Sequence, residues 1–401
     1  MGFGTVGSGV VELILQNKST IAKRSGQSSL DVKKILDIRD FSSHQLANLF
    51  TKDFNDILND KDVKIVVETM GGVNPAYDFV KKCLEAGKSV STSNKELVAT
   101  KGDELLKIAK ENNVNFLFEA SVGGGIPIIR PITQCLAANE IAEIYGILNG
   151  TTNYILTQMI HSSVSFSDAL KKAQELGYAE KDPTADVEGH DACRKICILS
   201  ALSFGKHVYP DQVHTEGITK IDLSDVAYCE NAGFVIKLIG KTSKISDDKV
   251  FATVYPAVIS LHSQLATVDD VYNAVMVRGD AIGDVVFYGR GAGKLPTASA
   301  VVADVIDCAK HLNSRKYVSW GDGKDDYVED FKQDTVGMYV RMKAKKQDVE
   351  KAFGKVKFLT YDGANADEIA FITDPMKEQA FDNLISMVNG EILSKIRVLD
   401  I

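Results

Sequence analysis

The sequence contains no apolar run that approaches the roughly 20 residues needed to cross a bilayer. It also shows no basic segment followed by a short apolar segment, which is the pattern of a secretory leader. Its six cysteines include no C-x-x-C pair, which argues against a disulfide framework and favours buried thiols in a reducing compartment. We therefore expect a cytoplasmic protein with no membrane partner.

Positive charge is also in short supply. The 401 residues include 46 Lys and Arg against 54 Asp and Glu, a net charge of −8. Binding to phosphate backbones needs a basic face, so nucleic acid is not an expected partner. The hydrophobic share of 45% and the charged share of 25% are ordinary for a soluble globular protein of two or three domains.

Most notably, almost nothing precedes the glycine-rich opening "MGFGTVGSGVVELI". Gly2, Gly4 and Gly7 form G-x-G-x-x-G with only Met1 before them, whereas this loop normally follows a central buried strand. Losing five or six strand residues at about 1.5–3 kcal/mol each removes burial on the order of 10 kcal/mol. Either the sequence is an incomplete record of a normal protein, which we favour, or its cofactor domain is damaged. We predict that the chain as written binds cofactor poorly.

The pattern along the chain predicts an α/β protein. In residues 1–131, strands alternate with helices, which indicates parallel βαβ units in a doubly wound, Rossmann-like sheet that lacks most of its first strand. Residues 132–298 are expected to form an α+β domain, and 299–320 a segment that returns to the first domain. A polar linker follows Trp320, and residues 330–401 match a small βαββαβ unit.

The first loop fits a dinucleotide. Gly4 would let the backbone approach a pyrophosphate, and the following helix would supply amide donors and its positive dipole. A glycine-rich turn with no ligand is the alternative. In "LDIRDF", Asp37 or Asp40 could accept a ribose 2′-hydroxyl and Arg39 could pair with a 2′-phosphate, so the choice between NAD and NADP stays open.

The segment "GYAEKDPTADVEGHDACRK" is the strongest constellation. Asp191 and Lys195 are four residues apart and share one face of a helix whose continuation is apolar nearly all round. A lysine in such a cleft can act as a general acid or base. The alternative is a group of capping acids with an ordinary ion pair.

Three further patterns are ambiguous. "NGTTNYIL" offers hydroxyls and helix-start amides to a small polar substrate, or simply an N-cap. "EASVGGGIPI" could hold a cation, admit the cofactor or form a hinge, and "GRGAGKLPT" is not a Walker loop because Leu295 replaces its Ser or Thr. His190, Cys193 and Cys197 share a helix face, where core packing explains them better than zinc.

Taken together, these motifs resemble those of homoserine dehydrogenases from Gly2 to His311. The matching stretches are "GFGTVGSGV", "ETMGG", "SNKELVA", "EASVGGGIPII", "NGTTNYIL", the Glu180–Lys195 segment and "GRGAGKLPTASAV". The resemblance implies a Rossmann-like domain and a catalytic domain that also forms the dimer or a higher oligomer. It implies reversible hydride transfer between NAD(P)H and L-aspartate 4-semialdehyde, giving L-homoserine for threonine and methionine synthesis.

The resemblance also implies roles for residues. Lys195 would be the acid–base, with Asp191 beside it and Lys95 as a second lysine near the reacting centre. The implied substrate-binding residues are Glu180, Asp186, Thr151 and Gly150. The implied cofactor-binding residues are Gly2, Gly4, Thr5, Val6, Gly7, Arg39, Thr69, Ser93, Lys95 and Gly291. A monovalent cation, Na⁺ or K⁺, would bind at Glu119 and at the carbonyls of Val122, Gly124 and Ile126.

The C-terminal unit resembles an ACT domain in pattern only, because "RMKAKKQDVEKAF" has no glycine between the first strand and helix. Feedback by threonine is therefore doubtful, and a module for packing or dimerisation fits as well. Two other functions stand beside the enzyme: a non-catalytic paralogue acting as a regulator or scaffold, and another semialdehyde or amino-acid dehydrogenase. The second does not explain the Glu180–Lys195 segment.

Overall fold

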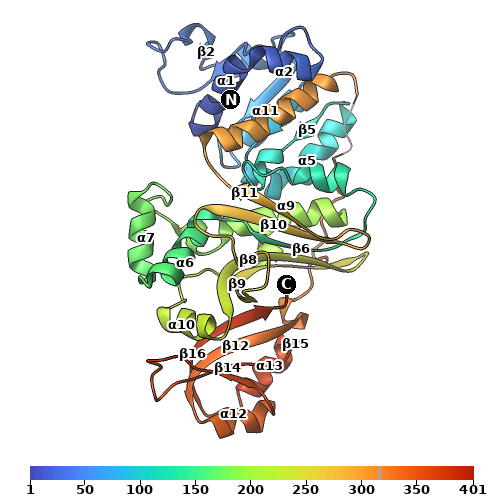
Figure 1. Cartoon of the computed structure of the whole chain (residues 1–401). Coiled ribbons are helices and arrows are strands. Elements are labelled where there is room, and N and C mark those ends of the chain that lie inside the picture. Colours follow the sequence, from blue (N-terminus) through green and yellow to red (C-terminus); the bar gives the residue numbers. More distant parts are fainter. Residues whose placement is uncertain (315–317) are drawn as a thin grey trace.

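The computed structural model describes residues 1–314 and 318–401. Figure 1 shows three parts stacked along one axis: a cofactor domain that carries the N-terminus, a central sheet with helices, and a C-terminal unit. No helix in these described residues is long and apolar enough to cross a membrane.

The cofactor domain alternates helices and strands as the sequence predicts. Its elements are α1 (Thr5–Gln16), α2 (Lys18–Ser25), β1 (Ile35–Leu36), η1 (Ala47–Leu49), β2 (Phe50–Thr51), α3 (Asn55–Leu58), β3 (Ile65–Glu68), α4 (Ala76–Glu85), β4 (Ser89–Thr92), α5 (Lys95–Glu111) and β5 (Phe116–Leu117). All pairings are parallel, but they form two pieces: β1 with β2, and β3 with β4 and β5.

Two residues connect these pieces. The Met1 nitrogen donates to the Val67 carbonyl at 2.7 Å, and the Thr69 amide donates to the Met1 carbonyl at 3.0 Å. On the other side, the Gly2 amide donates to the Leu36 carbonyl at 2.9 Å. Met1 and Gly2 therefore occupy the position of a strand between β1 and β3, at its carboxyl end.

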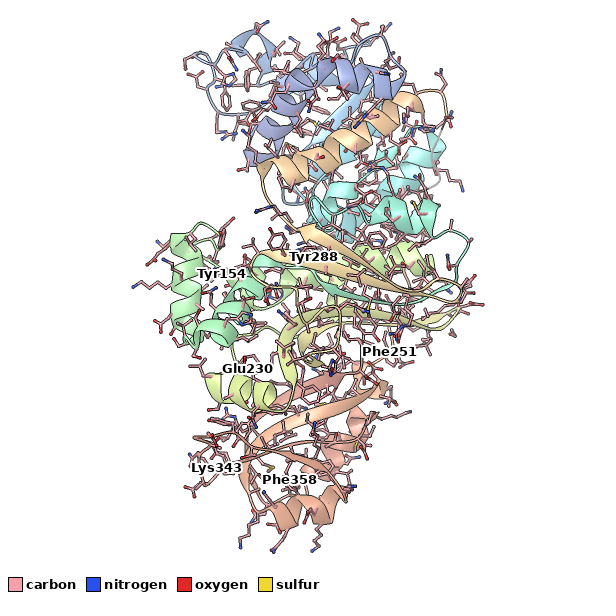
Figure 2. All side chains as sticks on the ribbon, in the orientation of Figure 1. Tyr154, Glu230, Phe251, Tyr288, Lys343 and Phe358 are labelled. Carbon is pink, nitrogen blue, oxygen red and sulfur yellow. The ribbon has the colours of Figure 1, made fainter. Side chains whose placement is uncertain are left out.

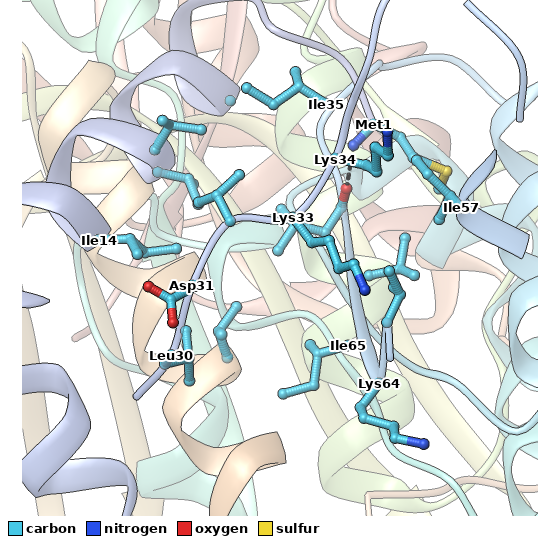
Figure 3. Close-up of a pocket in the computed structure, with 18 of the residues that line it drawn as sticks. Met1, Ile14, Leu30, Asp31, Lys33, Lys34, Ile35, Ile57, Lys64 and Ile65 are labelled. Atoms are coloured by element: carbon cyan, nitrogen blue, oxygen red, sulfur yellow. Dashed lines mark hydrogen bonds between the residues drawn. The ribbon is translucent and has the colours of Figure 1, made fainter. Parts of the chain in front are cut away.

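A cavity of about 280 Å³ opens beside Met1, between β1, β3 and α1 (Figure 3). Apolar side chains line much of it, among them Ile14, Ile35 and Ile65 from these elements and Ile57 from α3, while the exposed Lys33 and Lys64 also border it. The sequence analysis expects a sheet that lacks most of its first strand, and the cavity lies where the sheet is interrupted.

Helix α11 (Lys294–Lys310) returns to the cofactor domain directly after β11 (Gly283–Arg290), the edge strand of the central sheet that lies next to that domain (Figure 1). It packs on α1 at very short range: a Cβ on Gly9 would lie 2.9 Å from the Lys294 carbonyl oxygen and 3.1 Å from the Ala298 Cβ. Val10 and Ile14 of α1 share an apolar cluster with Ala298 and its neighbours. The predicted returning segment is therefore this helix, and it begins a few residues before 299.

The central part is built on an antiparallel sheet. Its elements are β6 (Ile141–Ile147), α6 (Gly150–Ser162), α7 (Phe166–Glu175), α8 (Thr184–Val187), α9 (His190–Phe204), β7 (His214–Thr215), α10 (Leu223–Asn231), β8 (Phe234–Ser246), β9 (Lys249–Ser260), β10 (Tyr272–Gly279) and β11 (Gly283–Arg290), with short turns η2 (Glu119–Ser121), η3 (Pro131–Cys135) and η4 (Pro210–Gln212). The strand order β11-β10-β6-β8-β9 places the end of β6 beside the start of β10.

The C-terminal unit has the predicted βαββαβ order. It consists of β12 (Thr335–Ala344), α12 (Lys346–Phe353), β13 (Lys357–Leu359), β14 (Ile369–Ile372), β15 (Met376–Lys377), α13 (Glu378–Ile385) and β16 (Gly390–Leu399), preceded by η5 (Phe331–Gln333). Figure 2 shows Phe358 and Lys343 within it. Strand β16 pairs with β12 and also runs parallel to β9, so the unit extends the central sheet. The preceding stretch is packed rather than free, since Trp320 and Tyr327 are buried.

Candidate active site

Helix α9 brings a lysine and an aspartate into the interior. The helix begins after Gly189, whose φ of 82° is the left-handed conformation that glycine adopts without strain. Asp191 and Lys195 are one turn apart and only 5% and 7% exposed. The rest of α9 is buried against β8 and β9, so the helix axis is fixed and both side chains keep their position.

These two residues and Lys95 form one charged cluster. The Lys195 ammonium donates to Asp191 Oδ2 at 2.7 Å and to the Leu148 carbonyl at 2.6 Å. The Lys95 ammonium lies 2.7 Å from the other carboxylate oxygen, Asp191 Oδ1. An ammonium has three N–H donors, so Lys195 keeps one donor for a further oxygen.

Burial and neighbouring charges shift the pKa values of these three residues in opposite directions. Burial lowers the pKa of the Lys195 ammonium, although Asp191 opposes this. Asp191 raises the pKa of Lys95. Burial alone would raise the pKa of the Asp191 carboxyl, but the two lysines hold it well below its usual range. The cluster thus combines a stable carboxylate with one lysine that gives up its proton more readily than usual.

Asn149 organises the substrate side of this cluster and was not among the residues predicted to act there. Its amide nitrogen donates to Asp186 Oδ1 at 2.7 Å and to Asp191 Oδ2 at 2.9 Å. Its side-chain oxygen accepts the Thr152 amide at 2.8 Å and so caps α6. The sequence signal for it is the N-cap position in "NGTTNYIL", and the structure confirms that N-cap. Asp186 is held near Asp191 in this way, and burial raises the pKa of its carboxyl.

The other predicted substrate residues differ in placement. The Thr151 hydroxyl donates to the Tyr178 carbonyl at 2.7 Å, so it serves the local structure, while the first amides of α6 lie beside the cluster. Glu180 is exposed on the loop before α8, and within the described residues its side chain forms no ion pair. Asp186 therefore lies in the cluster, whereas Glu180 lies outside it.

The opening loop has the spacing that a pyrophosphate requires. A Cβ on Gly7 would overlap the Gly2 carbonyl oxygen, so a side chain there would displace the loop. A Cβ on Gly4 would meet nothing within 4 Å, which leaves space in front of the first turn of α1, where Thr5 and Val6 begin the helix. The Thr69 hydroxyl donates to the Gly2 carbonyl at 2.9 Å and secures the loop. The chain's residues therefore fit a dinucleotide at this position.

At the end of β1, Asp37 and Arg39 form an ion pair in which two guanidinium nitrogens bond the carboxylate. The Asp37 carboxylate accepts the Phe3 amide at 2.7 Å and the Arg39 Nε and Nη2 groups at 2.9 Å each. Arg39 holds the pKa of Asp37 far below its usual range. Asp40 lies apart from this pair and accepts hydrogen bonds from Ser42. The guanidinium of Arg39 is half exposed and reaches solvent beside the cofactor loop.

The predicted cation residues lie in one loop with mixed roles. The Glu119 carboxylate accepts the amides of Ile128, Ile129 and Arg130 at 2.7–2.9 Å, so it caps the segment that follows. The loop after it turns through Gly123 and Gly124, both with positive φ, and Ile126 closes it by donating to the Gly123 carbonyl. In this loop Val122, Gly124 and Ile126 offer backbone carbonyls.

The glycine loop after β11 contacts this same region. A Cβ on Gly124 would overlap the Gly291 carbonyl, and the Gly125 amide donates to the Arg290 carbonyl at 3.1 Å. Ser93 closes β4 by donating its amide to the Glu68 carbonyl at 3.3 Å. The Gly291 loop thus contacts the Gly124 loop, and Ser93 at the end of β4 is two residues from Lys95 of the charged cluster.

The zinc alternative finds no support. Within residues 1–314 and 318–401, no group of three or more His, Cys, Asp or Glu side chains is arranged to hold a metal ion. Cys193 donates to the Pro210 carbonyl, and Cys193 and Cys197 are buried, as the core-packing interpretation requires. For His190 that interpretation is wrong, because this residue begins α9 and is exposed.

Family models and relatives agree on one identity. A model described as homoserine dehydrogenase matches residues 127–306, and one described as homoserine dehydrogenase, NAD binding domain, matches residues 2–119. The chain belongs to the homoserine dehydrogenase family. A homoserine dehydrogenase of Neisseria gonorrhoeae is 44% identical over 77% of this chain and 71% of its own length, and one of Bacillus subtilis is 35% identical over 99% and 96%.

Solved structures of homoserine dehydrogenases share the fold. A crystal structure from Thiobacillus denitrificans superposes with a TM-score of 0.91 at 34% identity, covering 100% of this chain and 97% of that one. A hyperthermophilic archaeal homoserine dehydrogenase in complex with NADPH gives a TM-score of 0.64 at 30% identity, covering 77% of this chain and 95% of that one. The chain is accordingly an oxidoreductase with an NAD-binding domain, as the sequence motifs imply.

Proposed function

We propose that this chain catalyses the reversible NAD(P)H-dependent reduction of L-aspartate 4-semialdehyde to L-homoserine, with Lys195 as the proton donor. The observation that supports this most strongly is the buried Lys195, which is bonded to Asp191 and Leu148 and keeps one donor free. It lies beside the start of α6, whose capping residue Asn149 bonds the same aspartate. This geometry supports the assignment of Lys195 as an acid beside the expected hydride acceptor.

The nicotinamide supplies the hydride, which adds to the aldehyde carbon. The carbonyl oxygen then takes on negative charge, and the Lys195 ammonium donates its proton to that oxygen to give the alcohol. In the reverse direction, neutral Lys195 takes the hydroxyl proton. The lowered pKa of Lys195 favours both roles.

The other charged residues would orient the substrate and Lys195 without taking part in proton transfer. Asp191 fixes Lys195 and Lys95 through its two oxygens, and Lys95 adds positive charge near the developing alkoxide. Asp186, held by Asn149, would accept the substrate's α-ammonium group by charge-assisted hydrogen bonds. We keep Glu180 as a second ammonium ligand, which requires its loop to move toward α6. Gly150 and Thr151 would offer helix-start amides to the α-carboxylate.

The preferred cofactor in this proposal is NADPH. Asp37 already accepts several donors from Arg39 and Phe3, so it has little capacity left for a ribose 2′-hydroxyl. The exposed Arg39 guanidinium is free on one side to pair with a 2′-phosphate. A monovalent cation at the carbonyls of Val122, Gly124 and Ile126 belongs to the same proposal, with Glu119 in support.

The same proposal includes a cytoplasmic homodimer or higher homo-oligomer that acts on a small molecule. The six cysteines are free thiols and five of them are buried, which supports a reducing compartment. An ACT-like C-terminal unit joined to the central sheet through β16 supports a packing role for that unit. No observation favours the non-catalytic alternative.

The test is NADPH oxidation with aspartate semialdehyde, followed at 25 °C beside a Lys195→Met variant. We expect turnover by the wild-type chain and at least a hundredfold loss in the variant. A folded wild-type protein that binds NADPH but does not oxidise it with this aldehyde would overturn the proposal.

A further inference from the structure

Asn273, near the start of β10, carries a buried side-chain amide with no hydrogen-bond partner. The residue is 1% exposed, and among the described residues neither its side-chain nitrogen nor its side-chain oxygen has a partner. Buried polar side chains are nearly always paired. Among the described residues, five others have one buried side-chain atom without a partner, whereas Asn273 lacks a partner at both atoms of its amide.

This amide lies between two parts of the candidate site. A Cβ on Gly291 would overlap the Asn273 side chain, and a Cβ on Gly150 would lie 3.5 Å from its oxygen. Gly291 is the proposed cofactor position and Gly150 the proposed substrate position. The strand register agrees, because Asn273 is opposite Gly289 and Ala274 is opposite Ile147, just before Gly150.

The surrounding contacts leave the Gly291 segment little freedom. On its other side the segment touches the Gly124 loop, where a Cβ would overlap the Gly291 carbonyl. Beneath it, Tyr272 and Tyr288 stack with ring centroids 5.2 Å apart, and Figure 2 shows Tyr288 below the cofactor domain. The Asn273 amide therefore lies against a segment whose position is constrained on its other side by the Gly124 loop.

We propose that Asn273 is a positioning residue of the cofactor site, whose amide gains hydrogen-bond partners when the nicotinamide end of the cofactor binds beside Gly291. An asparagine amide offers both N–H donors and a C=O acceptor, and it complements another amide. That amide is either a peptide group of the Gly291 segment or the carboxamide of the nicotinamide. This inference rests on the proposed function.

The test compares wild-type protein with Asn273→Leu, which keeps the shape and removes both polar atoms. Replacing an unpaired buried polar group by an apolar isostere is neutral or stabilising. We therefore expect an unchanged or higher Tm without cofactor, together with an NADPH Kd raised about tenfold by fluorescence titration. A lower Tm, or failure to fold, would overturn the inference because the amide would then be structural. An unchanged Kd would overturn it as well.

A cofactor analogue with a methyl group in place of the carboxamide, which offers neither donor nor acceptor, separates the two sources. If the tenfold difference vanishes with the analogue, the carboxamide is the partner; if the difference persists, the peptide group is. Asn153→Leu is the matched control. Asn153 is also 1% exposed, but its amide nitrogen donates to the carbonyls of Val268, Asp270 and Tyr272. We expect that control to lower Tm and to change the NADPH Kd less than threefold.

A second pair of variants tests the contact itself. Gly291→Ala places a methyl group against the Asn273 amide and should weaken NADPH binding. Asn273→Leu added to Gly291→Ala should then weaken binding by much less than the tenfold expected for Asn273→Leu alone, because both changes disable the same contact. Fully additive losses would overturn the assigned contact. Wild-type protein that binds NADPH but does not reduce aspartate semialdehyde would count against the proposed function alone, since the Kd comparison needs no turnover.

Discussion

The central sheet and the cofactor-domain sheet are built to different degrees of completeness. Strands β8 and β9 pair from Phe234 with Ser260 to Ser246 with Lys249, and most of their residues are buried. In the cofactor domain, β1 consists of Ile35 and Leu36, and Met1 and Gly2 join it to β3 through backbone hydrogen bonds.

Because of this difference, the residues proposed for proton transfer and the loop proposed for cofactor binding belong to sheets of unequal continuity. Lys195, the proposed proton donor, belongs to the central part together with Asp191 and Asn149. The dinucleotide loop depends on a sheet interrupted by a cavity of about 280 Å³. We infer that the reacting centre is rigid and that the strength of cofactor binding depends on how well the Gly2–Gly7 loop is supported.

The largest effect is expected in the central part. Lys195→Met removes the proton donor while keeping the length of the side chain, and general acid catalysis contributes about 10²–10⁴-fold. We expect kcat to fall by that factor with the NADPH Kd unchanged, measured by stopped-flow kinetics and fluorescence titration. Lys172→Met, which removes an exposed lysine on α7, is the control. A loss in kcat of less than tenfold for Lys195→Met would assign proton transfer to another group.

The next largest effect is expected from completing the interrupted sheet. Five apolar β-forming residues fused ahead of Met1 would enter the cavity beside β3, and the Met1 nitrogen would keep its bond to Val67 as an amide. Burial lowers the pKa of the Met1 ammonium, so the fusion also removes a buried charge. We expect a Tm several degrees higher and at least tenfold tighter NADPH binding.

The control for this extension has the same length but alternates serine and proline, which cannot pair on both sides. This control should change neither the Tm nor the affinity for NADPH. If the apolar extension also changes neither Tm nor NADPH affinity, the two residues Met1 and Gly2 already give the loop all the support it needs, and the contrast between the sheets has no functional consequence.

The sequence predicts much of this architecture because the signals are local. The period of apolar residues gives α9 and α11, the order of strands and helices gives the βαββαβ unit, and the i,i+4 spacing gives Asp191 beside Lys195. The role of Asn149 depends on Asp186 and Asp191, which lie about forty residues further on. The linkage of β16 to β9 also depends on packing between distant segments, which no local pattern encodes.

A smaller effect is expected at Arg39. Arg39→Ser removes the proposed 2′-phosphate partner and frees the Asp37 carboxylate to accept a ribose hydroxyl. We expect the preference for NADPH over NADH, measured as the ratio of kcat/KM values, to fall about tenfold while kcat with saturating cofactor stays the same. A ratio that does not change would show that Arg39 serves only to neutralise Asp37.

The smallest effect is expected at the joint between the two regions. His207 lies between the Ala99 carbonyl, at 2.9 Å, and the Trp320 indole N–H, which donates to its Nδ1 at 2.9 Å. Burial lowers the pKa of His207 below its ordinary 6.5. Just below pH 6.5, the unfolded chain therefore binds a proton at His207 that the folded chain does not bind. Stability is therefore full above about pH 6.5 and falls as pH drops below it, by at most about 1.4 kcal/mol per unit. Urea denaturation between pH 5 and 8 should show this slope, and His207→Gln should reduce it; an equal slope in both proteins would assign the pH dependence to other groups.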